Sequence, residues 1–190
     1  MREFEDIGGF LRFMEGMPGR LTVATEAGLT EAAKIIQHEA KEEIGHYQGA
    51  AGPFAGWDEL AASTQLERVR LGWTENDPLL RSGELRDHVK VSVGIGEAAI
   101  GVPNETVGDG SKANPARDIG HIAVWMENGT EKAPPRPFLG GAAVRKSHEA
   151  VDIAAGPLST LSRVYLRSML PSPIRTLLQV LALLSMRRWR

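Results

Sequence analysis

Apolar residues recur at steps of three and four over the first quarter of the chain, the spacing that places them on one face of an α-helix. The pattern predicts a long helix from Leu21 to Tyr47, with an apolar face made of Leu29, Ala32, Ala33, Ile36, Ala40, Ile44 and Tyr47. A shorter helix is predicted before it, around residues 4–14, and Pro18-Gly19 is expected to separate the two. After the Gly- and Ala-rich connector of residues 49–56, the helical pattern resumes at Trp57 and continues to Val69.

The middle of the chain changes to the two-residue alternation of a β-strand. His88–Val93 alternates strictly and predicts a half-buried strand, which Gly94–Glu97 is expected to join to Ala98–Val102 as a hairpin. Pro103–Asp118 is polar and predicts a long loop, of a length that is usually functional or ordered only on binding. Ile119–Met126 is compatible with either a strand or a short helix.

The clearest local signal concerns how the backbone is held between two segments. Gly129 is well placed to end a helix in the left-handed conformation. Residues 133–137 must be extended, because each proline fixes its own φ and disfavours helix in the residue before it. A helix is expected to restart near Leu139, to be interrupted by Gly156-Pro157 and to be followed by another through Met169.

The last segment, Ile174–Met186, is almost entirely apolar and about 13 residues long, shorter than the ~20 residues that span a bilayer. Its apolar positions surround most of the helix, so burial against several elements, including neighbouring subunits, is expected. The candidate contact residues of this C-terminal arm are Ile174, Leu177, Leu178, Leu181 and Trp189. The rival interpretation is a helix lying on a membrane surface, with residues 187–190 among the headgroups.

Composition narrows the function classes only slightly. The 190 residues are enough for one domain with a core, and a net charge of −2 gives no general attraction to nucleic acid or anionic membranes. The charge is uneven, since no acidic residue follows Asp152 while six arginines do. The absence of cysteine excludes disulfides and thiolate chemistry. The N-terminus lacks the pattern of a secretory signal, so synthesis in the cytoplasm is expected.

Candidate chemistry is sparse. His38–Glu42 begins like the helix of a zinc protease, but its fifth position is Glu, and a third ligand such as His46 would lie two turns away. A charged, solvated helix face is the simpler interpretation. Gly94–Gly101 has dinucleotide-like glycines but joins two strands, so it offers no helix N-terminus to a pyrophosphate. The sequence therefore predicts no catalytic, metal or cofactor site, and Trp57 and Trp125 are expected to be core or interface anchors.

Three separated segments carry a family pattern. Trp57–Thr64 contains Trp-x-x-Leu-x-x-x-Thr, and Pro78–Arg86 contains leucine followed by Ser-Gly-x-Leu-Arg before a strand. Residues 122–139 combine Glu-x-Gly-Thr with Pro-x-Arg-Pro-Phe-Leu. In this order and spacing they resemble the tail-completion and virion-morphogenesis proteins of tailed bacteriophages, including the minor tail protein Z type. The residues matched, as subunit-interface or structural signature, are Trp57, Gly83, Leu85, Glu127, Gly129, Thr130, Arg136, Pro137, Phe138 and Leu139.

The resemblance implies an α+β fold, in which a long N-terminal helix and C-terminal helices pack on a small antiparallel sheet. It also implies a structural virion protein that is not an enzyme and has no cofactor, assembled in the host cytoplasm. Such proteins form a homo-oligomeric ring, hexameric in related tails, at the head–tail junction around the DNA channel. Their partners are the neck or connector proteins and the tail-tube or tail-terminator proteins, with non-specific contact to packaged DNA and none to a membrane.

Two parts depart from the pattern: the loop of residues 104–115 is long, and the chain beyond Leu158 has no matched counterpart. We therefore divide the chain into a domain of residues 1–170 and a C-terminal arm of residues 171–190. The alternative function is a peripheral membrane or partner-binding module that acts through this arm.

Overall fold

The structure is a computed structural model that describes residues 6–169, with side chains described as far as residue 160. Long helices and two small antiparallel sheets make it an α+β fold, which confirms the fold class that the resemblance implied. The elements in chain order are α1 (Ile7–Glu15), α2 (Met17–Glu43), α3 (Ala62–Arg70), α4 (Glu84–Asp87), β1 (Lys90–Gly94), β2 (Glu97–Gly101), β3 (Thr106–Val107), β4 (Arg117–Asp118), α5 (Ile119–Asn128) and α6 (Phe138–Met169).

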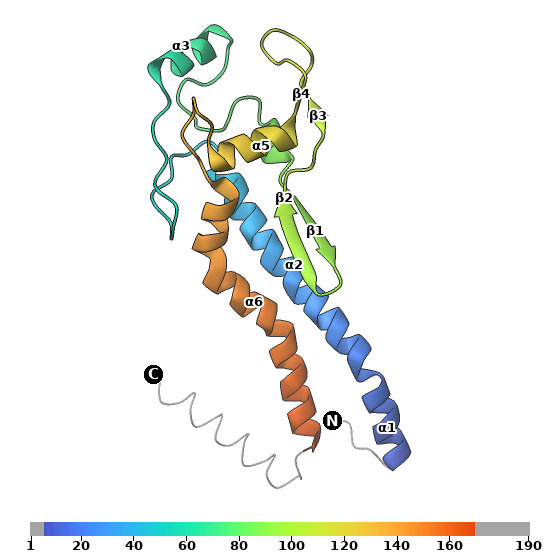
Figure 1. The fold of residues 1–190 in the computed structure, drawn as a ribbon. Coiled ribbons are helices and arrows are strands. Elements are labelled where there is room, and N and C mark those ends of the chain that lie inside the picture. The colour runs from blue at the N-terminus through green and yellow to red at the C-terminus, as the bar shows by residue number, and fades with distance from the viewer. Residues whose placement is uncertain (1–5, 170–190) are drawn as a thin grey trace.

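The molecule has a head and a helical stem (Figure 1). The head contains α3, α4, α5, β3 and β4. The stem consists of α2 and α6, which pack along each other, and α1 continues it at the end remote from the head. The β1–β2 hairpin lies beside α2.

The two N-terminal helices were predicted, but their boundaries differ. The break lies at Gly16, not at Pro18-Gly19, because Pro18 falls in the first turn of α2, where its missing N–H is not needed. α2 ends at Glu43, before the predicted Tyr47, since Gly45 adopts a φ of +106° and turns the chain into the head. The apolar face of α2 is nevertheless the predicted one, with Ala32, Ala33 and Ala40 buried.

α6 is one continuous helix, so the predicted interruption at Gly156-Pro157 is wrong. A proline inside a helix costs about 3 kcal/mol, which packing elsewhere can offset. Gly28 of α2 lies directly against the backbone carbonyl of Ala154, one turn before Pro157. This close packing of α2 against α6 stabilises the helical conformation of α6 near Pro157.

The predicted hairpin is confirmed, with Lys90 opposite Gly101 and Gly94 opposite Glu97 around the two-residue turn Ile95-Gly96. Gly96 has a φ of +75°, as a tight hairpin turn requires. The strand is covered less than its alternation predicted, since Val93 is 40% exposed. Among the described elements α2 packs against the hairpin, and Ile95 at the hairpin tip is 88% exposed.

Residues 103–118 are mostly loop, as predicted, but the loop is closed by two short strands. They include the β3–β4 pair, in which Thr106 faces Asp118 and the side chain of Val107 is buried. The ambiguous segment after them is the helix α5. Asp118 caps it by accepting a hydrogen bond from the backbone N–H of His121 at 3.0 Å.

The core lies where the head joins the stem. α3 begins at Ala62 and not at Trp57, whose indole instead enters this core. The core combines residues from α2, α4, α5, α6 and the connecting segments, and its buried members are Ala40, Ile44, Trp57, Leu85, Val89, Val107, Ile119, Ala123, Phe138 and Ala142.

The C-terminal arm, with Ile174, Leu177, Leu178, Leu181 and Trp189, lies outside the described residues. Within residues 6–169, no helix has the length and apolar character needed to cross a membrane.

Candidate functional site

Glu127, near the end of α5, holds the start of α6. One carboxylate oxygen accepts hydrogen bonds from the backbone N–H groups of Phe138 and Leu139, both at 3.0 Å, and the other accepts from Gly140 at 2.7 Å. These are amides of the first helical turn, which have no partner within the helix and which carry the positive end of its dipole. Glu127 therefore caps α6 from a different helix and fixes the angle between α5 and α6.

Arg136 links the junction of α5 and α6, which is called the corner below, to residues 58–59. Its side chain is 5% exposed and donates hydrogen bonds to the backbone carbonyls of Asp58 at 2.8 Å and Glu59 at 3.4 Å. Its backbone N–H donates to the carbonyl of Met126 at 2.7 Å. Burial is the main cause that lowers the pKa of its guanidinium. Residues 133–137, which contain three prolines, are called the proline strut below. Arg136, a member of the strut, thus connects it to α5 and to residues 58–59.

Gly129 and Thr130 form the turn between α5 and the strut. Gly129 has a φ of 75° but a ψ of 176°, so it is not the left-handed helical cap that was predicted. A Cβ there would lie 2.8 Å from the nitrogen of Pro135, which leaves room for glycine alone. The Thr130 N–H donates to the Ala133 carbonyl at 2.8 Å, and this bond closes a turn through residues 131–132.

The other signature residues are structural. Trp57 and Leu85 are buried, Phe138 is completely buried, Pro137 is buried, and Leu139 is half-buried against the same core. Gly83 precedes α4 with a φ of +86°, a conformation that favours glycine. The signature thus builds the interior of one chain, and its buried members are not available as subunit contacts.

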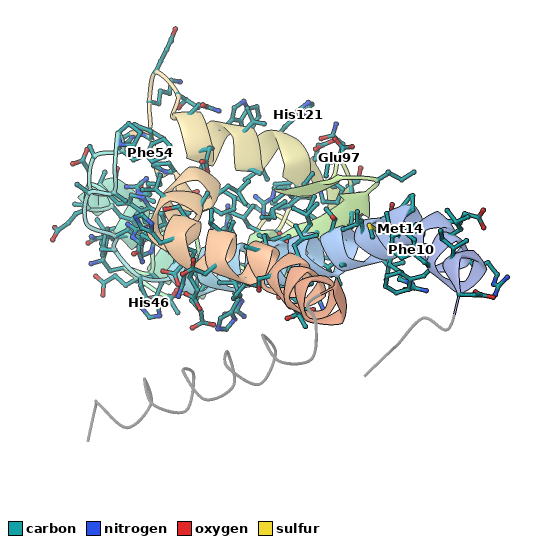
Figure 2. The ribbon with its side chains drawn as sticks, turned by 90° about the horizontal axis from the view of Figure 1, so that it is seen from below. Phe10, Met14, His46, Phe54, Glu97 and His121 are labelled. Carbon is teal, nitrogen blue, oxygen red and sulfur yellow. The ribbon has the colours of Figure 1, made fainter. Side chains whose placement is uncertain are left out.

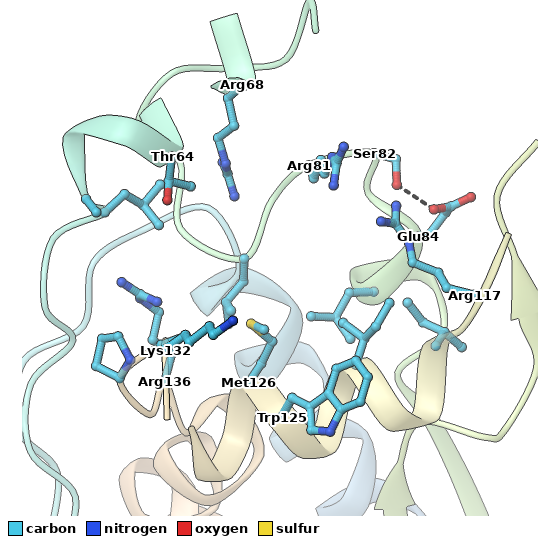
Figure 3. Close-up of a pocket in the computed structure, with 18 of the residues that line it drawn as sticks. Thr64, Arg68, Arg81, Ser82, Glu84, Arg117, Trp125, Met126, Lys132 and Arg136 are labelled. Carbon is cyan, nitrogen blue, oxygen red and sulfur yellow. Dashed lines mark hydrogen bonds between the residues drawn. The ribbon is translucent and has the colours of Figure 1, made fainter. Parts of the chain in front are cut away.

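The three segments that carry the resemblance meet around one pocket of about 500 Å³ (Figure 3). Residues 59–64 form one wall, residues 79–85 a second, and α5 with the strut a third. The lining is mostly apolar, with Leu60, Leu79, Leu85, Ile119, Ile122, Trp125, Met126 and Pro134 among its members. Trp125 lines this site and is 53% exposed, so it is not a core residue.

The charged groups of the pocket are unbalanced, with five basic and two acidic side chains. The basic ones are Arg68, Arg81, Arg117, Lys132 and Arg136, and the structure gives none of them an ion-pair partner among the described residues. The arginines donate mainly to neutral oxygens, such as Arg68 to the carbonyls of Asp77 at 2.6 Å and Leu80 at 3.0 Å.

Burial and neighbouring positive charge shift the pKa values of the arginines in the pocket. Burial, together with the nearby charge of Arg81, lowers the pKa values of Arg68 and Arg117. Among the described residues, the buried Nε atoms of Arg81 and Arg136 have no hydrogen-bond partner. Of the acidic residues, Glu84 already accepts several hydrogen bonds: burial would raise its pKa, but hydrogen bonds from Ser82, Asn114 and the Gly108 amide together lower it. The pocket therefore combines an apolar lining with an excess of positively charged side chains.

A second set of charged side chains, Glu43 and Arg145, lies between the two stem helices. Arg145 of α6 donates to Glu43 of α2, which is 2% exposed, and also to the Gly49 carbonyl at 2.8 Å. Burial raises the pKa of Glu43 to about 7, although the charge and hydrogen bond of Arg145 lower it. The pair joins the two stem helices beside the cap.

The alternative metal site does not form a cluster. His38, Glu42 and His46 are exposed, and the described residues contain no group of three or more His, Cys, Asp or Glu side chains that could hold a metal ion. The sequence did not single out Glu43, Arg68, Arg81 or Arg117. Each is a charged residue near apolar positions, a pattern that is common on solvent-exposed surfaces and does not distinguish these four.

Comparisons of the chain with family models, with curated proteins and with solved structures found no match.

Proposed function

We propose that this protein is a structural subunit of a tailed bacteriophage virion, which forms a ring at the head–tail junction and joins the tail to the head connector. The starting point is the resemblance of three segments to tail-completion proteins. The observation that carries the proposal further is that these segments, up to 78 residues apart, converge on one corner through Arg136, Glu127 and Phe138.

The chemistry of that corner favours architecture over catalysis. The carboxylate of Glu127 is consumed by three backbone amides, and the guanidinium of Arg136 by backbone carbonyls. Groups used in this way fix shape and are not free to attack a substrate or to transfer a proton. A rigid corner suits a ring subunit, because a preorganised surface loses little entropy when it docks.

The apolar surface of the stem also supports assembly. Exposed apolar side chains include Ile7, Leu11, Val23 and Val151, with Ile7 80% exposed. Single exposed apolar residues are ordinary, but a helix with an uncovered apolar stripe is typical of an interaction surface. A subunit that contacts neighbours on two sides of a ring requires such surfaces.

Removal of the gene from its replicon, followed by electron microscopy of the lysate, tests the role. We expect filled heads and unattached tails, and a plasmid copy of the gene should restore complete particles. Complete, infectious particles formed without the protein would contradict the proposal.

A further inference from the structure

α1 has an apolar face that the other described residues leave exposed. Ile7, Leu11 and Met14 follow one another at steps of four and three, on one stripe of the helix, and are 80%, 55% and 36% exposed. None of the 9 residues of α1, all of which the structure describes, is buried. Figure 2 shows Phe10 and Met14 at the end of the molecule opposite to Phe54.

The pocket in the head has the complementary character. Its lining is mostly apolar, and it carries five basic but only two acidic side chains. Its volume of about 500 Å³ is in the range of sites that enclose a ligand group. The occupant that fits is a short apolar segment with acidic side chains.

Charge selects between the two apolar ends of the chain. Residues 1–15 contain Glu3, Glu5, Asp6 and Glu15 against Arg2 and Arg12, so this end is acidic. The end after Asp152 has arginines and no acidic residue, and the basic pocket would repel it.

The distance between α1 and the pocket decides which copy is involved. α2 has 27 residues and so measures about 40 Å, and α1 lies at its end away from the head (Figure 1). The helix therefore cannot reach the pocket of its own chain. Contact between two different surfaces on identical subunits is heterologous. Repeated heterologous contacts form a closed ring when the rotation from one subunit to the next is a whole fraction of a full turn.

We infer that α1 of one subunit docks by its Ile7–Leu11–Met14 stripe into the apolar, basic pocket of the next subunit. This inference rests on the proposed ring and names the contact between its subunits. It places Trp125, at the exposed side of the pocket, against the incoming helix.

Matched substitutions in the full-length chain test the contact. Ile7→Lys and Trp125→Glu should each weaken self-association at least about tenfold, because each replaces an apolar contact by a charge that its partner surface repels. The controls are Ile95→Lys at the hairpin tip and Val124→Glu beside Trp125, at positions that are similarly exposed but outside the contact. Light scattering over a range of concentrations measures association, and circular dichroism checks that each variant is folded.

Cross-linking tests the geometry, which the absence of native cysteine makes straightforward. Leu11→Cys protein and a size-tagged Lys132→Cys protein are mixed and treated with a short bismaleimide. We expect a product that joins the two different chains, and little product when Glu97→Cys replaces Lys132→Cys. A product joining two Leu11→Cys chains, or equal products in both mixtures, would show that α1 docks elsewhere.

The two proposals fail separately. If loss of the gene leaves unattached tails while Ile7→Lys and Trp125→Glu chains still associate like the wild type, the docking is wrong and the virion role stands. A wild-type chain that stays monomeric and yields no mixed cross-link also overturns the docking. Complete particles without the gene product would overturn the virion role, whatever the cross-links show.

Discussion

At the scale of single residues, Glu127 shows how one side chain fixes the relation between two helices. Its carboxylate reaches amides 11 to 13 residues later in the sequence. A capping box, by contrast, places the acidic residue three positions after the cap, inside the same helix. The sequence therefore marked Glu127 only through the family pattern, and its capping role required the structure.

Replacing Glu127 tests this role. Glu127→Ala leaves three amides of α6 without their acceptor, and we expect the free energy of unfolding to fall by about 1–3 kcal/mol. Urea denaturation measures the change. Glu131→Ala is the control, because Glu131 is exposed in the adjacent turn. Equal midpoints for the two variants would contradict the capping role.

Glu43 predicts a pH dependence. In the unfolded chain its carboxyl group ionises near the ordinary value of 4.5, whereas in the fold burial raises its pKa to about 7. The folded state therefore binds more protons between these values, and the contribution of Glu43 to stability falls as the pH rises from 4.5 to about 7.

The matched variant is Glu43→Gln, which cannot ionise. Thermal unfolding between about pH 5 and pH 8 should show the Tm of the wild type falling relative to that of Glu43→Gln. Parallel curves for the two proteins would show that Glu43 has an ordinary pKa.

At the scale of elements, periodicity predicted the types of most segments correctly. The helices α1 and α2 and the β1–β2 hairpin were predicted, because their patterns extend over several turns or alternations. The β3–β4 pair was missed, since strands of two residues carry no periodicity. The continuity of α6 was also missed. Gly156-Pro157 predicts a break from neighbouring residues alone, whereas the packing of α6 against α2 joins residues far apart in the sequence.

The crossing of α2 and α6 yields a prediction that separates packing from helix propensity. Gly28→Ala would place a methyl group against the Ala154 carbonyl and force the helices apart, so we expect a lower Tm. Gly19→Ala, in the same helix with nothing within 4 Å, should raise stability by up to about 1 kcal/mol. Differential scanning calorimetry of the two variants measures both effects. Similar shifts of the same sign would show that the crossing is looser than described.

At the scale of the whole molecule, the described residues of the core, of the pocket and of the contact between Gly28 and Ala154 all lie between positions 28 and 154. Deletion of residues 171–190 should therefore leave a folded domain with a Tm close to that of the full chain. We expect this domain to assemble poorly, because the apolar arm is predicted to be buried against neighbouring subunits. Calorimetry and light scattering measure the two properties. Rings that form normally from the truncated chain would contradict the predicted role of the arm.

The sequence by itself determined the types of α1, α2 and the β1–β2 hairpin, the apolar face of α2 and the absence of helix in residues 134–137 before Phe138. Each follows from φ restrictions or from periodicity within a few neighbouring residues. Only the tertiary structure decided that Glu127 caps α6, that Glu43 is buried against Arg145, and that five basic side chains share one apolar pocket. These features join residues far apart in the chain, and their burial and charge depend on the packing of the whole fold.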